Sequence, residues 1–202
     1  MEFRDAKPQD YEGIVHCIYH GFEHHFKHFN TSETSIKKLL LNILRLNQFK
    51  VVLDNGQVIA CCGIGEGGIR LYKKDKSIFR QEFGFIKGTI MGITLYQILG
   101  KPYKVDPNCG YFEFVTILNS YRGRGIMKQF LNWIMEKKEH PCFMLDVANN
   151  NIVAIELYKS LGFVETHRVK EKFSKQAGFE YTIFMKSKGY ISSNSITPSL
   201  SK

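Results

Sequence analysis

Apolar and polar positions along the chain follow periods that predict short strands interleaved with helices. Residues 2–6 form a predicted strand, after which Pro8 and Asp10 are typical of the first turn of a helix that runs to about Phe22. A hydroxyl at Thr31 is suited to cap a second helix, because it can accept a hydrogen bond from a first-turn N–H group. The apolar residues of this second helix recur at close to the helical period: Ile36, Leu39, Leu40, Ile43, Leu44 and Leu46.

Two strands joined by a tight turn are predicted next. Residues 49–53 and 57–64 are apolar runs on either side of Asn55 and Gly56. Asn-Gly between apolar runs is a strong hairpin signal, because both residues tolerate positive φ. The second strand is expected to end in a stretch of four glycines, Gly63, Gly65, Gly67 and Gly68.

Residues 70–107 form an unusually long and apolar connection. Within it, residues 77–99 predict either one long helix or two. Gly84, Gly88 and Gly92 recur every fourth residue, which is typical of a flat strip where helices approach closely. Lys87 interrupts the apolar run, so we favour a helix packed on protein, or a lid, over a membrane span.

The second half of the chain alternates strands and helices. Strands are predicted at 111–118, 142–147, 163–168 and 180–185, and helices at 125–138 and 152–161. The full order predicts an α/β (α+β) fold with a central mixed sheet of about six or seven strands, flanked by helices, and a helical insert before the fourth strand. We expect one domain over residues 1–186, followed by a polar, flexible tail at 187–202.

Charge and cysteine content narrow the functional classes. The 202 residues carry 28 Lys and Arg against 19 Asp and Glu, a net charge of +9 that attracts anions. The basic residues are scattered, so nucleic-acid binding is not expected. The five cysteines are odd in number and have no CxxC spacing, so we expect neither a disulfide framework nor a structural zinc site, and a reducing cytoplasm is the natural setting. No signal-peptide core and no membrane span are predicted.

A Gly-rich turn between a predicted strand and a predicted helix is the first candidate for chemistry. Free N–H groups and the helix dipole converge at such a turn, which suits an anion such as a pyrophosphate. Glycines allow the backbone to approach phosphates closely, although an ordinary strand–helix turn explains Gly-x-Gly equally well. The candidate residues are Ile117, Leu118, Asn119, Arg122, Gly123, Arg124, Gly125, Ile126, Met127 and Lys128.

A second motif follows about twenty residues later, in the run from Leu145-Asp146-Val147 to Leu161-Gly162-Phe163. A helix face and a C-terminal glycine cap explain its apolar residues and Gly162. They do not explain Asn151 near the start of the helix or Tyr158 in its middle. The Tyr158 phenol is able to donate a proton or a hydrogen bond.

Together the two motifs resemble the signatures of the GNAT acetyltransferase superfamily, roughly V-x-P-x-x-R-G-x-G-[IL]-G and L-x-V-x3-N-x2-A-x2-L-Y-x3-G-F. The resemblance covers residues 109–186 and departs from the pattern at Asn119, where Pro is common, and at Met127, where a small residue is usual. The matching residues are Ile117, Arg122, Gly123, Gly125 and Ile126 in the first signature, and Leu145, Val147, Asn151, Ala154, Leu157, Tyr158, Gly162 and Phe163 in the second.

The resemblance implies an acetyl-CoA-dependent N-acetyltransferase that transfers its acetyl group directly to an amine. The backbone at Ile117 would pair with the pantetheine amides, and the turn from Arg122 to Lys128 would hold the pyrophosphate. Asn151 would contact the cofactor, and Tyr158 would protonate the leaving thiolate. Met127 is the one hint of the alternative, a non-catalytic GNAT-fold acyl-CoA-binding module or scaffold, whereas Tyr158 favours an enzyme.

Glu113 is the candidate general base. It lies four residues before Ile117 on one predicted strand, so both side chains are expected on the same face. A carboxylate near the cleft is able to take the proton of the amine directly or through water. The competing interpretation is a surface or ion-paired glutamate.

Aromatic residues and histidines in the first half complete the list of candidates. Tyr19, Phe22 and Phe26 are predicted to line an acceptor pocket beneath the insert. Histidines spaced four residues apart can bind metal. Gly21 is expected to break the helix, however, and no carboxylate or thiol at a suitable spacing completes a site, so no metal is expected. The alternative is that these histidines belong to the acceptor pocket. These histidines are His16, His20, His24 and His28, with His25 beside them. The acceptor amine is unidentified, and the chain is expected to be a monomer or homodimer.

Overall fold

A seven-stranded mixed sheet in the order β1-β2-β3-β4-β5-β7-β6 forms the centre of the computed structural model, which describes residues 1–27, 30–73, 75–99, 106–172, 174 and 178–189. Among the paired strands, only β4 and β5 run parallel, so the predicted mixed sheet is confirmed. The strands are β1 (Glu2–Asp5), β2 (Phe49–Asp54), β3 (Gln57–Gly65), β4 (Cys109–Ile117), β5 (Cys142–Ala148), β6 (Phe163–Lys170) and β7 (Tyr181–Ser187).

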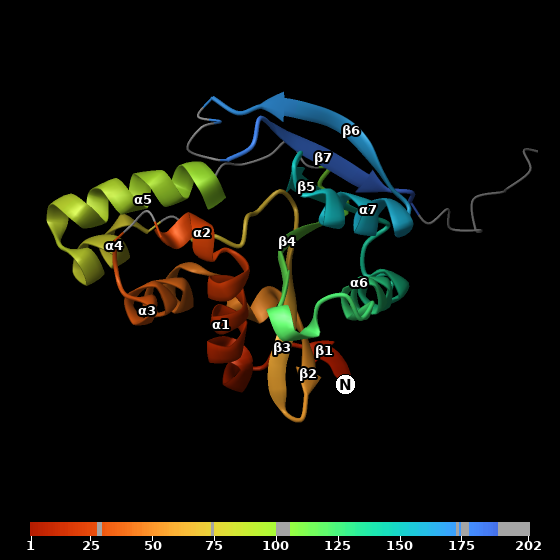
Figure 1. Cartoon of the computed structure of the whole chain (residues 1–202), viewed down its shortest axis with the longest axis horizontal. Helices are drawn as coiled ribbons and strands as arrows, with labels where there is room; N and C mark the ends of the chain where they lie inside the picture. The colour runs from red at the N-terminus through yellow and green to blue at the C-terminus, as the bar shows by residue number, and fades with distance from the viewer. Residues whose placement is uncertain (28–29, 74, 100–105, 173, 175–177, 190–202) are drawn as a thin grey trace, which may run out of the picture.

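Helices cover both faces of the sheet, with the first five on one side and the last two on the other (Figure 1). Each face has its own apolar core: Ile14, Phe49 and Phe79 are buried in the first core cluster, and Phe130 and Phe143 in the second. The helices are α1 (Tyr11–Gly21), α2 (Glu23–Phe26), α3 (Glu33–Ile43), α4 (Lys76–Phe83), α5 (Phe85–Leu99), α6 (Ile126–Glu136) and α7 (Ile152–Ser160).

The predicted hairpin between β2 and β3 is confirmed. Asn55 and Gly56 both adopt positive φ, 48° and 79°, which is the conformation that a tight two-residue turn requires. The α3 cap differs from the prediction by one residue: the Ser32 side chain, rather than Thr31, accepts the first-turn hydrogen bond, from the Ser35 N–H at 3.1 Å.

The insert between β3 and β4 is two helices rather than one. Gly84 adopts φ 77° and separates α4 from α5. A Cβ added at Gly88 would lie 2.3 Å from the Phe79 carbonyl oxygen, so the two helices cross in close contact there. Phe79, Met91 and Leu95 enter the first core cluster. No helix in the described part of the chain is long and apolar enough to cross a membrane, and residues 100–105 of the predicted insert lie outside the described residues.

Cys109 and Cys142 are joined by a disulfide, which corrects the expectation drawn from cysteine number and spacing. The two cysteines occupy paired positions at the start of the parallel strands β4 and β5. Sequence spacing does not reveal this pairing, because it depends on the register between strands 33 residues apart. β7 continues to Ser187, one residue past the predicted domain boundary. The Ser187 hydroxyl accepts a hydrogen bond from the Phe143 N–H, near the start of β5, at 2.9 Å. Residues 190–202 of the predicted tail lie outside the described residues.

Candidate active site

β4 and β5 diverge in the middle of the sheet. Four residue pairs join them, from Cys109 with Cys142 to Phe112 with Leu145. Beyond Phe112, β4 continues to pair with β3, and beyond Leu145, β5 continues to pair with β7. Each strand therefore presents an unpaired edge to the other, and such an edge is able to bind an extended chain through its backbone N–H and C=O groups.

A β-bulge lies at the point of divergence. Cys61 pairs with Thr116 and Gly63 with Glu113, so β4 contains one extra residue relative to β3. Phe114 lies in this bulge and adopts φ 53°, an uncommon conformation for a residue with a bulky side chain. Its ring packs in the first core cluster, 6.1 Å from that of Phe22 and 6.0 Å from that of Phe49.

The bulge reverses the alternation of side chains along β4. Phe114 packs in the first core cluster, and Ile117 packs against the second, on the other face of the sheet. Glu113 lies on the face opposite Ile117, because its carboxylate contacts Arg70 and Leu71, and Leu71 belongs to the first core cluster. The prediction that Glu113 and Ile117 face the same way is therefore wrong, since it assumed a regular strand.

The Glu113 carboxylate is buried and ion-paired. Arg70 Nε donates to it at 2.8 Å and the Leu71 N–H at 3.2 Å. Burial raises the pKa of Glu113 to about 7, against the opposing effect of Arg70, which lowers it. A carboxyl group that titrates near neutral pH has the pKa suited to a general base.

Three further polar residues, Arg70, Tyr111 and Asp146, lie around Glu113, and none of them is among the residues predicted from the sequence. The Tyr111 hydroxyl donates to the Asp146 carboxylate at 2.7 Å, across the diverging strands. The Arg70 guanidinium lies 5.7 Å from the centre of the Tyr111 ring. Asp146 was detectable as the one charged residue in an apolar strand, whereas nothing in the sequence around Arg70 indicated its contact with Glu113.

Tyr158 approaches the diverging strands from the opposite face. It is buried on α7 in the second core cluster, with its ring 5.9 Å from that of Phe163. Burial raises its pKa, and the charge of Asp146 adds to the effect, so the phenol is protonated at neutral pH. The Asp146 charge also raises the pKa of Glu113. Asp146 thus lies near both groups, one from each face of the sheet.

The Gly-rich turn presents unpaired backbone N–H groups. Gly123 and Gly125 adopt φ 75° and 72°, and a Cβ at either would meet open space. In the described part of the chain, no acceptor is bound to the N–H groups of residues 123–128, where α6 begins. Six unpaired donors at a helix N-terminus form a site for an anion.

Side chains of the turn both add charge and hold its shape. Arg122 Nε donates to the Ile117 carbonyl at 3.4 Å, and Arg124 Nη2 donates to that of Ser120 at 2.8 Å. Lys128 is exposed. The turn is also tied to the β2–β3 hairpin, because the Tyr121 hydroxyl donates to Asp54 at 3.1 Å.

The other predicted cofactor residues have mixed surroundings. Leu118 donates its backbone N–H to the Ile59 carbonyl at 2.9 Å, and Asn119 begins a short 3-10 turn. Ile126 is buried, and Met127 packs against the second core cluster. Asn151 has a structural role that the sequence analysis did not find: it caps α7 by accepting a hydrogen bond from the Ala154 N–H at 3.3 Å.

The predicted acceptor residues come together on the face that carries Glu113. Tyr19 and Phe26 stack with ring centres 5.9 Å apart, and Phe22 meets Phe114 of the bulge edge-on. Phe26 is buried, whereas Tyr19 and Phe22 are half-buried against the first core cluster. Met91 and Leu95 of the insert belong to the same cluster, so the insert shares a core with these aromatic residues.

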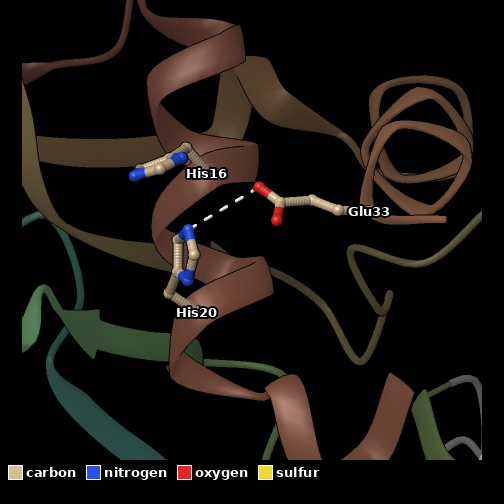
Figure 2. A group of neighbouring side chains, drawn as sticks. All are labelled: His16, His20 and Glu33. Atoms are coloured by element: carbon tan, nitrogen blue, oxygen red, sulfur yellow. Dashed lines mark ion pairs between the residues drawn. The ribbon is translucent and has the colours of Figure 1, made fainter. Parts of the chain in front are cut away.

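The histidines do have a carboxylate nearby, which corrects the expectation that none completes the set. α1 continues through His16 and His20 to Gly21, and Glu33 of α3 faces both imidazoles (Figure 2). His24 lies on α2, while His28 and the side chain of His25 lie outside the described residues.

Comparisons with known proteins identify the family and the fold. A family model described as the acetyltransferase (GNAT) family matches residues 18–163. No curated protein gives a significant match. An N-acetyltransferase from Staphylococcus aureus Mu50 superposes with a TM-score of 0.59 at 16% identity, covering 92% of this chain and 100% of that one. The ribosomal-protein-S18-alanine N-acetyltransferase from Escherichia coli has a TM-score of 0.59 at 15% identity, covering 96% and 97%.

A NatC complex bound to Gag peptide and CoA gives a TM-score of 0.53 at 14% identity, covering 92% of this chain and 96% of that one. At such identities the solved structures bear on the fold alone. The family model spans more than half of the chain, and the chain therefore belongs to the GNAT family of acetyltransferases.

Proposed function

We propose that the protein is an acetyl-CoA-dependent N-acetyltransferase that acetylates a primary amine by direct attack. The observation that carries the proposal is the divergence of β4 and β5 beside a turn with six unpaired N–H donors. The diverging strand edges suit an extended pantetheine chain, and the turn suits a pyrophosphate. The turn directly follows β4 in the sequence.

The residues present fit this co-substrate. The turn combines open space at Gly123 and Gly125 with the cationic side chains of Arg122, Arg124 and Lys128. The Met127 side chain packs against the second core cluster, which supports room for a pyrophosphate at the turn and argues against a non-catalytic binding module. Acetyl-CoA, when bound, supplies a thioester whose acetyl carbon is open to attack by an amine.

Residues on the two faces of the sheet divide the proton transfers. Glu113 accepts a proton from the amine, directly or through water, as the new N–C bond forms. Tyr158 donates its proton to the sulfur as the C–S bond breaks. The net reaction converts thioester and amine to amide and thiol. Afterwards Glu113 releases its proton to solvent and Tyr158 takes one up from solvent, so the protons balance. Positioning and stabilisation of the thiolate supply much of the acceleration.

The acceptor is proposed to be a small molecule or a peptide with a free amine. Tyr19 and Phe22 lie on the face that carries Glu113, which favours an acceptor with an apolar or aromatic group near its amine. Two of the similar folds, by their names, concern a ribosomal-protein alanine and a bound peptide, so peptides with free amino termini belong in the panel of acceptors.

The test is acetyl-CoA consumption with a panel of small amines and peptides, together with acetyl-CoA binding. Gly125→Glu is expected to abolish binding, because it places a negative charge where the phosphates lie. Gly125→Ala is the matched control, because it shares the cost of a side chain at φ 72° but adds no charge. Equal acetyl-CoA affinity in the two variants would contradict the assignment of the turn. Acetyl-CoA binding without consumption across the panel would instead indicate a binding module.

A further inference from the structure

A cluster of two histidines and one glutamate lies between α1 and α3, beside the predicted acceptor residue Tyr19, whose ring centre is 5.3 Å from that of His20. His16 and His20 are one helical turn apart, with ring centres separated by 4.3 Å. Glu33, in the first turn of α3, extends toward them, and its carboxylate lies 3.7 Å from His20 Nε2 (Figure 2). One ligand atom from each of the three residues lies within 4.8 Å of the other two.

A positive charge already lies against two of the three residues. Lys37 Nζ lies 2.5 Å from the Glu33 carboxylate and 2.9 Å from His16 Nδ1. An ammonium group only donates hydrogen bonds, so His16 Nδ1 is the acceptor and its lone pair points at the cation. His16 accepts this hydrogen bond as a neutral imidazole, and that is the form in which histidine binds metal.

We propose that His16, His20 and Glu33 form a binding site for a divalent transition-metal ion, Zn²⁺ in the first instance, and that Lys37 takes the place of the ion when none is bound. Two imidazole nitrogens and a carboxylate oxygen are ligands that Zn²⁺ accepts, with a water completing a tetrahedral site.

Tetrahedral coordination at about 2.0–2.1 Å places ligand atoms about 3.3 Å apart, so the three side chains have to draw together slightly. The side chains of His20 and Glu33 are 38% and 42% exposed and have room to rotate. The long side chain of Lys37 is able to swing out to solvent as the ion enters.

The position of the cluster indicates a structural role for the ion. His16 and His20 lie on the side of α1 that faces α3, and Glu33 belongs to α3 itself. A neighbouring side of α1 contacts β4, where Thr116 Oγ1 donates to the Cys17 carbonyl at 3.4 Å. A bound ion would therefore fasten α1 to α3, the helix pair that carries Tyr19, without reaching the residues proposed for acetyl transfer.

The experiment uses tag-free protein with Co²⁺ as the spectroscopic probe and Zn²⁺ as its competitor. Co²⁺ is expected to give visible d–d absorption without a near-ultraviolet thiolate band, and Zn²⁺ is expected to abolish this absorption and to raise the melting temperature. His20→Ala should weaken binding of both ions by at least about 10–100-fold, the range found for even outer-shell changes. Lys37→Met should strengthen binding, because it removes the competing cation.

His167→Ala is the matched control, since it removes an exposed histidine on β6, and it should leave affinity unchanged. His20→Gln serves as a second variant if His20→Ala unfolds. The proposal is wrong if His20→Ala binds Co²⁺ and Zn²⁺ as tightly as the wild type and Lys37→Met do. The cluster is then an ion-pair network around Lys37. A thiolate band that disappears in Cys142→Ser would also refute it, because the metal would then lie at Asp106, Cys109 and Cys142 with the Cys109–Cys142 disulfide reduced. Neither outcome bears on the acetyltransferase proposal.

Discussion

At the scale of single residues, the Tyr158 phenol is the proposed acid, and its burial keeps it protonated. Tyr158→Phe removes the proton but preserves the ring that packs near Phe163. We expect turnover to fall by roughly 10²–10⁴-fold while acetyl-CoA affinity changes little. Tyr72→Phe is the control, because Tyr72 is a buried tyrosine of the first core cluster and should retain turnover. Equal losses of affinity and rate in Tyr158→Phe would identify Tyr158 as a packing residue.

Glu113 should impose a pH dependence on the reaction. It accepts a proton only when ionised and its pKa is about 7, so kcat/KM is expected to rise with pH through this value. Glu113→Gln should lose this rise and most of the rate. Arg70 lowers the pKa of Glu113, so Arg70→Met should move the rise to higher pH. An unchanged pH profile in both variants would assign the rise to another group.

The same pKa shift predicts how stability varies with pH. The folded protein retains a proton on Glu113 that the unfolded chain releases from the ordinary pKa of 4.5 upward. The free energy of unfolding is therefore expected to fall as pH rises from about 4.5 to about 7. Urea unfolding over this pH range should show a smaller fall in the free energy of unfolding for Glu113→Gln than for the wild type. A steeper fall in the variant would contradict a raised pKa at Glu113.

Residue placement was predictable from the sequence only where strands and helices are regular. Glu113 was placed on the wrong face because the bulge at Phe114 occurs in an apolar run without Gly or Pro to indicate it. The contact of Arg70 with Glu113 joins residues 43 positions apart. Phe114 of the bulge packs against Phe22 and Phe49, which are distant in the sequence, and local sequence does not encode that packing.

At the scale of elements, the crossing of α4 and α5 predicts that alanine substitutions at two glycines of α5, Gly88 and Gly92, have different effects on stability. A Cβ at Gly88 would lie 2.3 Å from the Phe79 carbonyl oxygen, whereas one at Gly92 would lie 3.4 Å from the Phe79 ring. Gly88→Ala is therefore expected to cost about 1–3 kcal/mol of unfolding free energy. Gly92→Ala should be neutral or stabilising by up to about 1 kcal/mol, because alanine favours helix.

Urea unfolding measures both variants, and hydrogen exchange within α4 and α5 shows whether the loss in Gly88→Ala is local to the insert. Similar effects of the two substitutions would show that the helices do not cross at Gly88. The sequence predicted a strip of three glycines, but only Gly88 meets the backbone of the neighbouring helix. Gly84 instead ends α4 with positive φ, a role that spacing alone does not distinguish from packing.

Elements with strong local signals were predicted correctly, and contacts between elements were not. The Asn55-Gly56 turn and the helices after Gly125 and Asn151 follow from turn and capping preferences within a few residues. The histidine cluster was dismissed for lack of a ligand spacing, because Glu33 lies on a different helix from His16 and His20. Its position depends on how α1 packs against α3, which local sequence patterns do not report.

At the scale of the whole molecule, the sheet consists of two antiparallel halves, β1–β4 and β5–β7. In the described part of the chain, the four residue pairs between β4 and β5 are the sheet's only ladder between these halves. The Cys109–Cys142 disulfide spans the first of these pairs, at the end away from the divergence. It therefore joins the two halves covalently at the base of the proposed active site.

Loss of this disulfide should lower stability without changing the fold. Closing a loop of 33 residues restricts the unfolded chain by about 3–4 kcal/mol, so the Cys109→Ser/Cys142→Ser double variant is expected to lose about that much unfolding free energy. Reductant should lower the unfolding free energy of the wild type toward that of the double variant, and it should leave the unfolding free energy of the double variant unchanged. Under denaturing conditions, the unreduced wild type should titrate only the thiols of Cys17, Cys61 and Cys62. If it titrates all five, the two halves are held by the short β4–β5 ladder and side-chain packing alone.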